Sequence, residues 1–141
     1  MAAGRIYWID RCLGSNVVPA ALRTVGVEIR TYADLYPNDP KIQDADWIPE
    51  VAGRGWVILT KDKNIRRLSV EVQALRAAQA RYVCLSAANM TGEAQVACLL
   101  QHWKTIDSVV ASKRAPLIVA VTRANVQWLD GDDWRVAKHK R

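Results

Sequence analysis

Four aspartates carry the strongest chemical signal in the chain, because each stands close to an apolar run that predicts a buried element. Asp10 follows the run RIYWI, and Asp62 comes just after the run WVILT. Asp44 and Asp46 open the segment that leads into the second run. Two carboxylates about 4 Å apart repel each other by roughly 4 kcal/mol at an effective dielectric of about 20. A cluster of such groups needs a bound cation or must retain protons, and oxygen ligands favour Mg²⁺ or Mn²⁺ over zinc.

Basic side chains flank these acids along the chain. A run of charges commonly forms a solvated face, but beside a carboxylate–metal edge it can also contact the phosphates of a nucleic acid. Asn64 either ligates the metal, directly or through water, or caps a helix that begins at Ile65. A hard cation in such a setting activates water and stabilises an in-line phosphoryl displacement. The basic candidates for phosphate contact are Arg11, Lys61, Lys63, Arg66 and Arg67.

The segment that contains Asp44 and Asp46 predicts a short helix. Pro49 lacks an N–H and fits the first helical turn, which makes Asp46 the expected N-cap. The glycines on either side of Arg54 end the helix. The following run, WVILT, shows no polar alternation and therefore predicts a strand buried on both faces, with Asp62 at its carboxyl end. Ligands bind at that end of the strands in open α/β sheets.

Apolar periodicity predicts alternating strands and helices along the rest of the chain. Helices are expected at 17–25, 65–80 and 91–112, and residues 33–43 are expected to form a loop. Right-handed crossovers then give an α/β fold with a mainly parallel sheet and helices on both faces, so that the acids after the strands meet at one edge. The strands are expected at 5–9, 27–32, 56–60, 81–86 and 116–122, with an antiparallel return at 126–129.

Length and charge narrow the class of protein. The 141 residues predict a single domain, 1–141, with a basic tail from about residue 130. The net charge of +6 suits a polyanionic partner. No dinucleotide-binding or P-loop motif is present. The N-terminus lacks a signal-peptide layout and no apolar run approaches the roughly 18 residues of a membrane span, so no membrane association is expected. The cations of the tail are Lys138, Lys140 and Arg141.

The cysteines indicate a reduced environment. There are three, an odd number, and none has the spacing of a metal site. A cytoplasmic location is therefore expected. Cys12 lies two residues after Asp10, but no His lies nearby in sequence, so Cys12 is expected to be a small buried side chain rather than a nucleophile.

Together, the strand end YWID, the helix start DADW and the stretch WVILTKDK with NIRR resemble the short PIN-like nucleases, including the VapC-type toxins of toxin–antitoxin pairs. The resemblance is clearest over residues 5–86 and extends to the whole length of the chain. It implies a three-layer α/β/α PIN-like fold, Mg²⁺ or Mn²⁺ as cofactor, and endoribonuclease activity on an RNA substrate. It also implies a cognate antitoxin protein as partner and is compatible with a homodimer.

The resemblance assigns roles to individual residues. Asp10 matches the first acid of the family and Asp62 the third, whereas Asp44 and Asp46 compete for the second. Asn64 stands where related sequences often carry a fourth acid, so the metal site is less charged and the choice between one and two metals stays open. The candidate catalytic residues are Asp10, Asp46 and Asp62, and the candidate metal ligands are these three with Asp44 and Asn64.

Two other classes of function remain open from the sequence. One is a non-catalytic RNA- or protein-binding domain with the same fold, which metal-dependent cleavage would distinguish. The other is a phosphoacceptor signalling domain, with acids after strands one and three and a hydroxyl, Ser86, after strand four. That class requires paired acids after strand one and a Lys after strand five. Here Asp10 is followed by Arg11, and Arg123 follows strand five.

Overall fold

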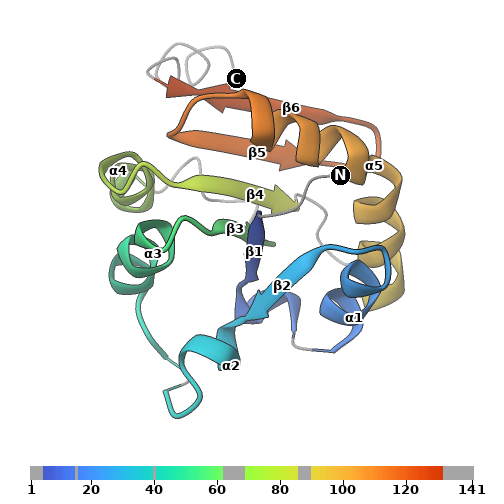
Figure 1. Ribbon diagram of the computed structural model, residues 1–141, viewed down its shortest axis with the longest axis horizontal. Coiled ribbons are helices and arrows are strands. Elements are labelled where there is room, and N and C mark those ends of the chain that lie inside the picture. The colour runs from blue at the N-terminus through green and yellow to red at the C-terminus, as the bar shows by residue number, and fades with distance from the viewer. Residues whose placement is uncertain (1–4, 15, 40, 62–68, 86–89, 132–141) are drawn as a thin grey trace.

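The fold, seen in a computed structural model, is a six-stranded sheet with helices on both faces (Figure 1). The structure describes residues 5–14, 16–39, 41–61, 69–85 and 90–131, and at 44–45 and 69–72 it describes the course of the helix without the side chains. The strands are β1 (Ile6–Ile9), β2 (Glu28–Thr31), β3 (Val57–Thr60), β4 (Arg81–Leu85), β5 (Leu117–Val121) and β6 (Val126–Asp130).

The sheet has the order β2-β1-β3-β4-β5-β6, in which β6 alone among these six runs antiparallel to its neighbour. Every residue of β3 and of β5 is buried, and for β3 the unbroken apolar run WVILT predicted this. The antiparallel return at β6 was also predicted. Because β1 and β3 are neighbours, the residues that follow these two strands leave the sheet side by side.

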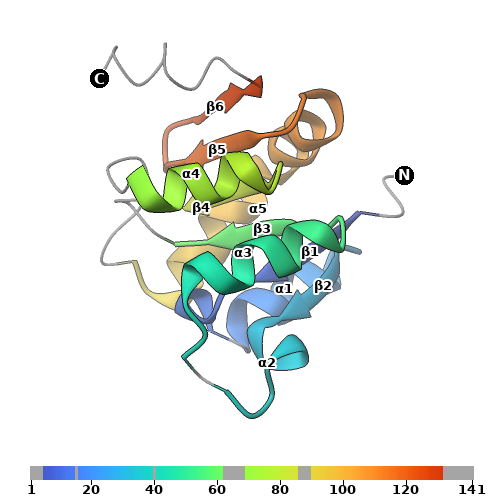
Figure 2. The ribbon, with the colours of Figure 1, turned by 90° about the vertical axis from the view of Figure 1, so that its left-hand side faces the viewer.

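Four helices form the outer layers of the fold. Helices α1 (Val17–Thr24) and α5 (Gly92–Ser112) cover one face, and α3 (Asp44–Gly53) and α4 (Ser69–Ala77) cover the other, which faces the viewer in Figure 2. Each face has its own buried hydrophobic cluster, because alternate strand residues point to opposite sides. This arrangement confirms the α/β/α fold that the sequence predicted.

Helix α5 follows its sequence signals closely. The side chain of Thr91 accepts a hydrogen bond from the amide of Ala94, and Glu93 lies in the first turn, where a negative charge is favourable. Of the helices within the described ranges, none has the length and apolar character needed to cross a membrane.

The predicted loop at 33–43 is wrong at its beginning, where the short helix α2 (Tyr32–Leu35) forms. A capping box starts this helix: the amide of Asp34 donates to the Thr31 hydroxyl, and the amide of Thr31 donates to the Asp34 carboxylate. The expectation from Pro37, Pro40 and their polar neighbours missed α2 because the capping signal lies at the end of the preceding strand.

The predicted start of the next helix is also wrong. Helix α3 begins at Asp44 with Gln43 as N-cap, so Asp46 is the third helical residue rather than the cap. The amides of Asp46 and Trp47 both donate to the carbonyl of Gln43. Pro49 consequently lies inside the helix, at an exposed position. Proline prefers the first turn, but burial of Trp47 against the sheet decides where this helix begins.

Candidate active site at the carboxyl edge of the sheet

Asp10 leaves the sheet at the carboxyl end of β1, directly beside the end of β3. Its amide donates to the carbonyl of Leu59 at 3.0 Å, and the register pairs Ile9 with Leu59. Asp10 is also the N-cap of the short 3₁₀ helix η1 (Arg11–Leu13), and its Oδ1 accepts from the amide of Arg11 at 2.7 Å. The strand and the cap together fix the direction of this carboxylate.

Thr60, the last residue of β3, orients the other oxygen of the same carboxylate. Its hydroxyl donates to Oδ2 of Asp10 at 3.1 Å, and only 1% of the Thr60 surface is exposed. The sequence analysis did not single out Thr60. The available signal was a lone hydroxyl at the end of an otherwise apolar run, two residues before a candidate acid.

Cys12 completes this group, and the expectation that it is buried is wrong because the residue as a whole is exposed. Its Sγ lies 3.1 Å from Oγ1 of Thr60 and accepts from the amide of Lys61 at 3.2 Å. Burial of the thiol group itself, together with the charge of Asp10, raises the pKa of Cys12. A raised pKa keeps the thiol protonated at neutral pH, which agrees with the expectation that Cys12 is not a nucleophile.

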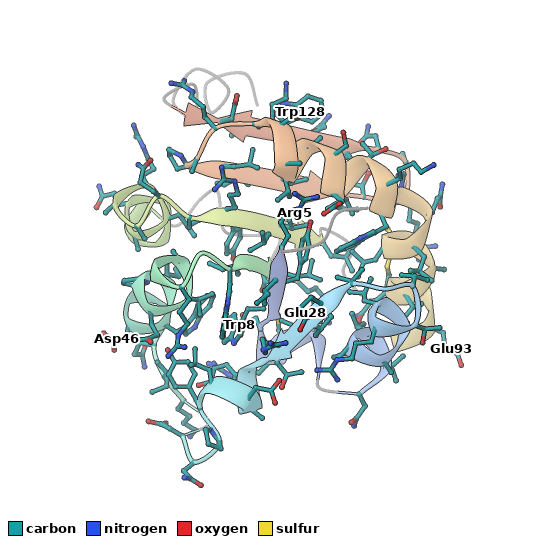
Figure 3. All side chains as sticks on the ribbon, in the orientation of Figure 1. Arg5, Trp8, Glu28, Asp46, Glu93 and Trp128 are labelled. Carbon is teal, nitrogen blue, oxygen red and sulfur yellow. The ribbon has the colours of Figure 1, made fainter. Side chains whose placement is uncertain are left out.

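Helix α3, which carries Asp44 and Asp46, begins at this same edge of the sheet. A helix that leads into a parallel strand runs antiparallel to it, so α3 begins near the carboxyl end of β3 (Figure 2). Asp46 is exposed on the outer side of α3, whereas Trp8 lies between α3 and the sheet (Figure 3). Its helical neighbours Pro49 and Glu50 are exposed as well. The side chain of Asp44 lies outside the described part.

Several predicted site residues lie outside the described residues: Asp62, Lys63, Asn64, Arg66 and Arg67. Within the described ranges there is no group of three or more His, Cys, Asp or Glu side chains that could hold a metal ion. The gathering of the four aspartates therefore stays a prediction. The structure does bring the ends of β1 and β3 together, and the second of these ends lies two residues before Asp62.

Two of the predicted phosphate contacts lie in the described part and border Asp10. Arg11 follows it directly, is exposed, and places its guanidinium carbon 4.8 Å from the centroid of the Tyr32 ring. Lys61 follows Thr60 at the end of β3 and is partly buried. Both residues therefore lie at the ends of neighbouring strands, next to Asp10 and Thr60, and their contact with phosphate stays a prediction.

Comparison with known proteins identifies the family. Residues 6–87 match the family described as "PIN like domain", a span that runs from β1 to β4 and includes Asp10, α3 and Thr60. The chain belongs to the PIN-like domain family. "Putative ribonuclease VapC45" of Mycobacterium tuberculosis (strain ATCC 25618 / H37Rv) is 34% identical over 110 residues, which cover 77% of this chain and 75% of that protein. No solved structure matches. The resemblance to PIN-like, VapC-type proteins is thereby confirmed.

The edge of this PIN-like domain suits a hard cation. Asp10 presents a carboxylate at this edge, whose oxygens accept hydrogen bonds from the Arg11 amide and the Thr60 hydroxyl. Its charged oxygen is a donor that Mg²⁺ and Mn²⁺ prefer. The neighbouring sulfur of Cys12 is a soft donor that already contacts the Thr60 hydroxyl and the Lys61 amide. The oxygen donor at this edge, the Asp10 carboxylate, is of the kind that suits Mg²⁺ or Mn²⁺.

Proposed function

We propose that this chain is a metal-dependent endoribonuclease and the toxin of a toxin–antitoxin pair. The observation that carries the proposal is the carboxylate of Asp10, held by Thr60 at the edge where β1 and β3 end. Membership of the PIN-like family and the printed name of the relative, a putative ribonuclease, support the same activity. The substrate is RNA, and an antitoxin protein is the natural partner.

The metal ligands in this proposal are Asp10, Asp62 and an acid of α3, with Asn64 binding directly or through water. Helical register favours Asp44 as the acid of α3. Residues three and four positions apart share a helical face, and the position of Asp44 is three before Trp47 and four before Ile48, both of which are buried. The exposed Asp46 lies on the opposite face of the helix, away from these buried residues.

The described side chains have distinct parts in this activity. A bound Mg²⁺ or Mn²⁺ supplies charge neutralisation and activates a water molecule for attack on a phosphodiester. Thr60 orients the Asp10 carboxylate, which needs a fixed direction to act as a ligand. The exposed Arg11 and the partly buried Lys61 provide positive charge for the RNA backbone beside Asp10.

The remaining basic residues extend the proposed RNA path. The whole chain forms one PIN-like domain, and the tail from about residue 130 adds weaker, nonspecific attraction to RNA. An antitoxin would silence the enzyme by covering the carboxylate edge, for example with an Arg side chain placed against the acids. An RNA-cleaving toxin of this kind acts in the cytoplasm, where its substrate is. The residues proposed to guide RNA across the carboxylate edge are Lys61, Lys63, Arg66 and Arg67, together with Arg11, which follows Asp10.

Metal removal and restoration test the proposed function. Purified protein should cleave a labelled single-stranded RNA with Mg²⁺ or Mn²⁺, stop in excess EDTA, and recover when the metal is restored. Calorimetric titration should show Mn²⁺ binding to the wild type that Asp62→Asn weakens. Unchanged cleavage in EDTA would contradict the metal-dependent mechanism. RNA binding without cleavage under any metal condition would favour the non-catalytic alternative.

A further inference from the structure

Tyr32 connects the two sides of the candidate site through one side chain. It is the first residue of α2, directly after the carboxyl end of β2, and only 6% of its surface is exposed. Its ring packs against Trp8 of β1, with 5.7 Å between ring centroids, and lies beneath the guanidinium of Arg11. The ring thus contacts the residue that follows Asp10.

The hydroxyl of Tyr32 binds the backbone on the other side of the site. It donates to the carbonyl of Asp39 at 3.0 Å and accepts from the amide of Ile42 at 2.9 Å. These bonds reach seven and ten residues along the chain and use both hydrogen-bonding roles of the phenol. Ile42 lies two residues before α3 begins, so the phenol holds the segment that leads into the helix.

The segment before α3 is held by the hydrogen bonds of Tyr32 and by the packing of the partly buried Ile42 side chain against the hydrophobic cluster that contains Trp8. The N-cap of α3, Gln43, makes no side-chain capping hydrogen bond. The ring of Trp47, 4.8 Å from that of Trp8, holds the first turn against the sheet. Among the hydrogen bonds of the described residues, those of the Tyr32 hydroxyl tie the backbone at Asp39 and Ile42 to the end of β2.

We propose that Tyr32 is a positioning residue, whose hydroxyl sets the place of the α3 acids relative to Asp10. The inference rests on the proposed function, since it assumes that an acid of α3 shares a metal with Asp10. Side chains that support metal ligands from outside the ligand set typically change metal affinity by about 10- to 100-fold when removed. Because Tyr32 acts on the backbone before the helix, a loss of about 10-fold is expected.

Tyr32→Phe is the variant that isolates the hydroxyl. It keeps the ring that packs against Trp8 and carries Arg11, and it leaves the carbonyl of Asp39 and the amide of Ile42 without this partner. Tyr7→Phe is the matched control. Tyr7 is also buried, and its hydroxyl donates to Asp107 at 2.7 Å, in a contact between β1 and α5 that involves none of the candidate site residues.

Two measurements test the inference. Amide hydrogen exchange of metal-free protein should show about 10-fold faster exchange at Ile42 in Tyr32→Phe and no change there in Tyr7→Phe. Titration with Mn²⁺ should show about 10-fold weaker binding in Tyr32→Phe and wild-type binding in Tyr7→Phe. The melting temperature of each variant records the general loss of stability.

The outcomes separate this inference from the function on which it rests. If wild-type protein binds Mn²⁺ and Tyr32→Phe binds it equally well, the hydroxyl is only structural and the inference is wrong, while the proposed function stands. Equal weakening by Tyr7→Phe and Tyr32→Phe would also overturn it, because loss of stability alone would then explain the effect. If wild-type protein binds no Mn²⁺, both the inference and the proposed metal site fail.

Discussion

The hydroxyl of Thr60 donates a hydrogen bond to Oδ2 of Asp10 at 3.1 Å, which joins the ends of two neighbouring parallel strands. Fifty residues separate the two along the chain. Because Thr60 is buried and its hydroxyl donates to a carboxylate, loss of this hydrogen bond should lower both the stability of the fold and the activity.

Replacing Thr60 with Val should therefore slow RNA cleavage by about 10-fold or more, since Val keeps the shape of the side chain but cannot orient Asp10. The free energy of unfolding should fall by about 1–3 kcal/mol, measured by urea denaturation. Thr60→Ser is the matched control, because it keeps the donor, and its cleavage rate should stay near that of the wild type. If the Val and Ser variants cleave equally fast, Thr60 does not position Asp10.

The two acids of α3 should behave differently when each is removed. Asp44→Ala should reduce cleavage by at least about 100-fold, as expected for the loss of a ligand to a catalytic metal. Asp46→Ala should keep most of the wild-type rate, because Asp46 is exposed on the outer face of α3. Initial rates at saturating Mn²⁺ give the comparison. The reverse result, with Asp46 essential and Asp44 dispensable, would show that helical register assigns the wrong acid.

The basic residues after Asp62 should contribute to the salt dependence of RNA binding. In single-stranded RNA, the log of affinity falls with log salt by about 0.7 per neutralised phosphate. Replacing Lys63, Arg66 and Arg67 together with Ala should therefore flatten the slope by about two units if each contacts a phosphate. Fluorescence anisotropy on an Asp62→Asn background, where cleavage is disabled, gives this slope.

Removal of the tail cations is the matched comparison for that experiment. It neutralises the same number of charges but should change the slope less, since the tail is proposed to bind RNA weakly and without specificity. Equal slopes for the wild type and the variant that lacks the three cations after Asp62 would show that these side chains form a solvated face. The tail cations replaced are Lys138, Lys140 and Arg141.

A contact on α5 should make the stability of the fold depend on pH. The guanidinium of Arg5 donates to both carboxylate oxygens of Asp107 at 2.9 and 2.8 Å, and Tyr7 donates to the same group. Hydrogen bonding from Arg5, aided by Tyr7, lowers the pKa of Asp107 against the opposing effect of burial. A carboxyl whose pKa is lower in the folded state stabilises the fold above its unfolded pKa, and that stability is lost as the pH falls through the folded value.

Asp107→Asn should therefore lower the free energy of unfolding by about 1.5–3 kcal/mol at pH 7. The difference from the wild type should shrink as the pH falls below 3.8, the ordinary pKa of this carboxyl, toward the folded value. Urea denaturation across this range measures it. Glu50→Gln is the control: Glu50 on α3 and Arg54, the C-cap of that helix, form an exposed pair, so its effect should stay within about 1 kcal/mol. A wild-type advantage that does not change with pH would contradict the assignment to Asp107.

The sequence predicted the backbone of this site better than its hydrogen bonds. The runs RIYWI and WVILT are apolar on both faces, so a central strand was the expected structure for each, and the acids that follow were expected at one edge. The helix at α5 was also predicted from Thr91 at its N-cap. These features depend on local pattern and on the handedness of parallel crossovers, both of which can be read from the chain.

The contacts of Thr60 and Tyr32 could not be predicted in the same way. The bond from Thr60 to Asp10 depends on the register of β1 against β3, which apolar runs without alternation do not specify. The bonds of Tyr32 depend on the course of the segment at 36–43, where turn residues indicate a loop but not its path. The predicted start of α3 was wrong for a related reason, since burial of Trp47 against the sheet outweighed the preference of Pro49 for the first helical turn.

The central claim is that Asp10 belongs to the reaction centre of a ribonuclease. Its most direct test is the rate at which Asp10→Asn protein cleaves single-stranded RNA with saturating Mn²⁺, with circular dichroism to confirm the fold. Asn keeps the size of the side chain and an oxygen that can accept from Thr60, but removes the charge that holds a cation. The rate should fall by at least about 100-fold while the spectrum matches that of the wild type. Cleavage at the wild-type rate by folded Asp10→Asn protein would contradict the claim.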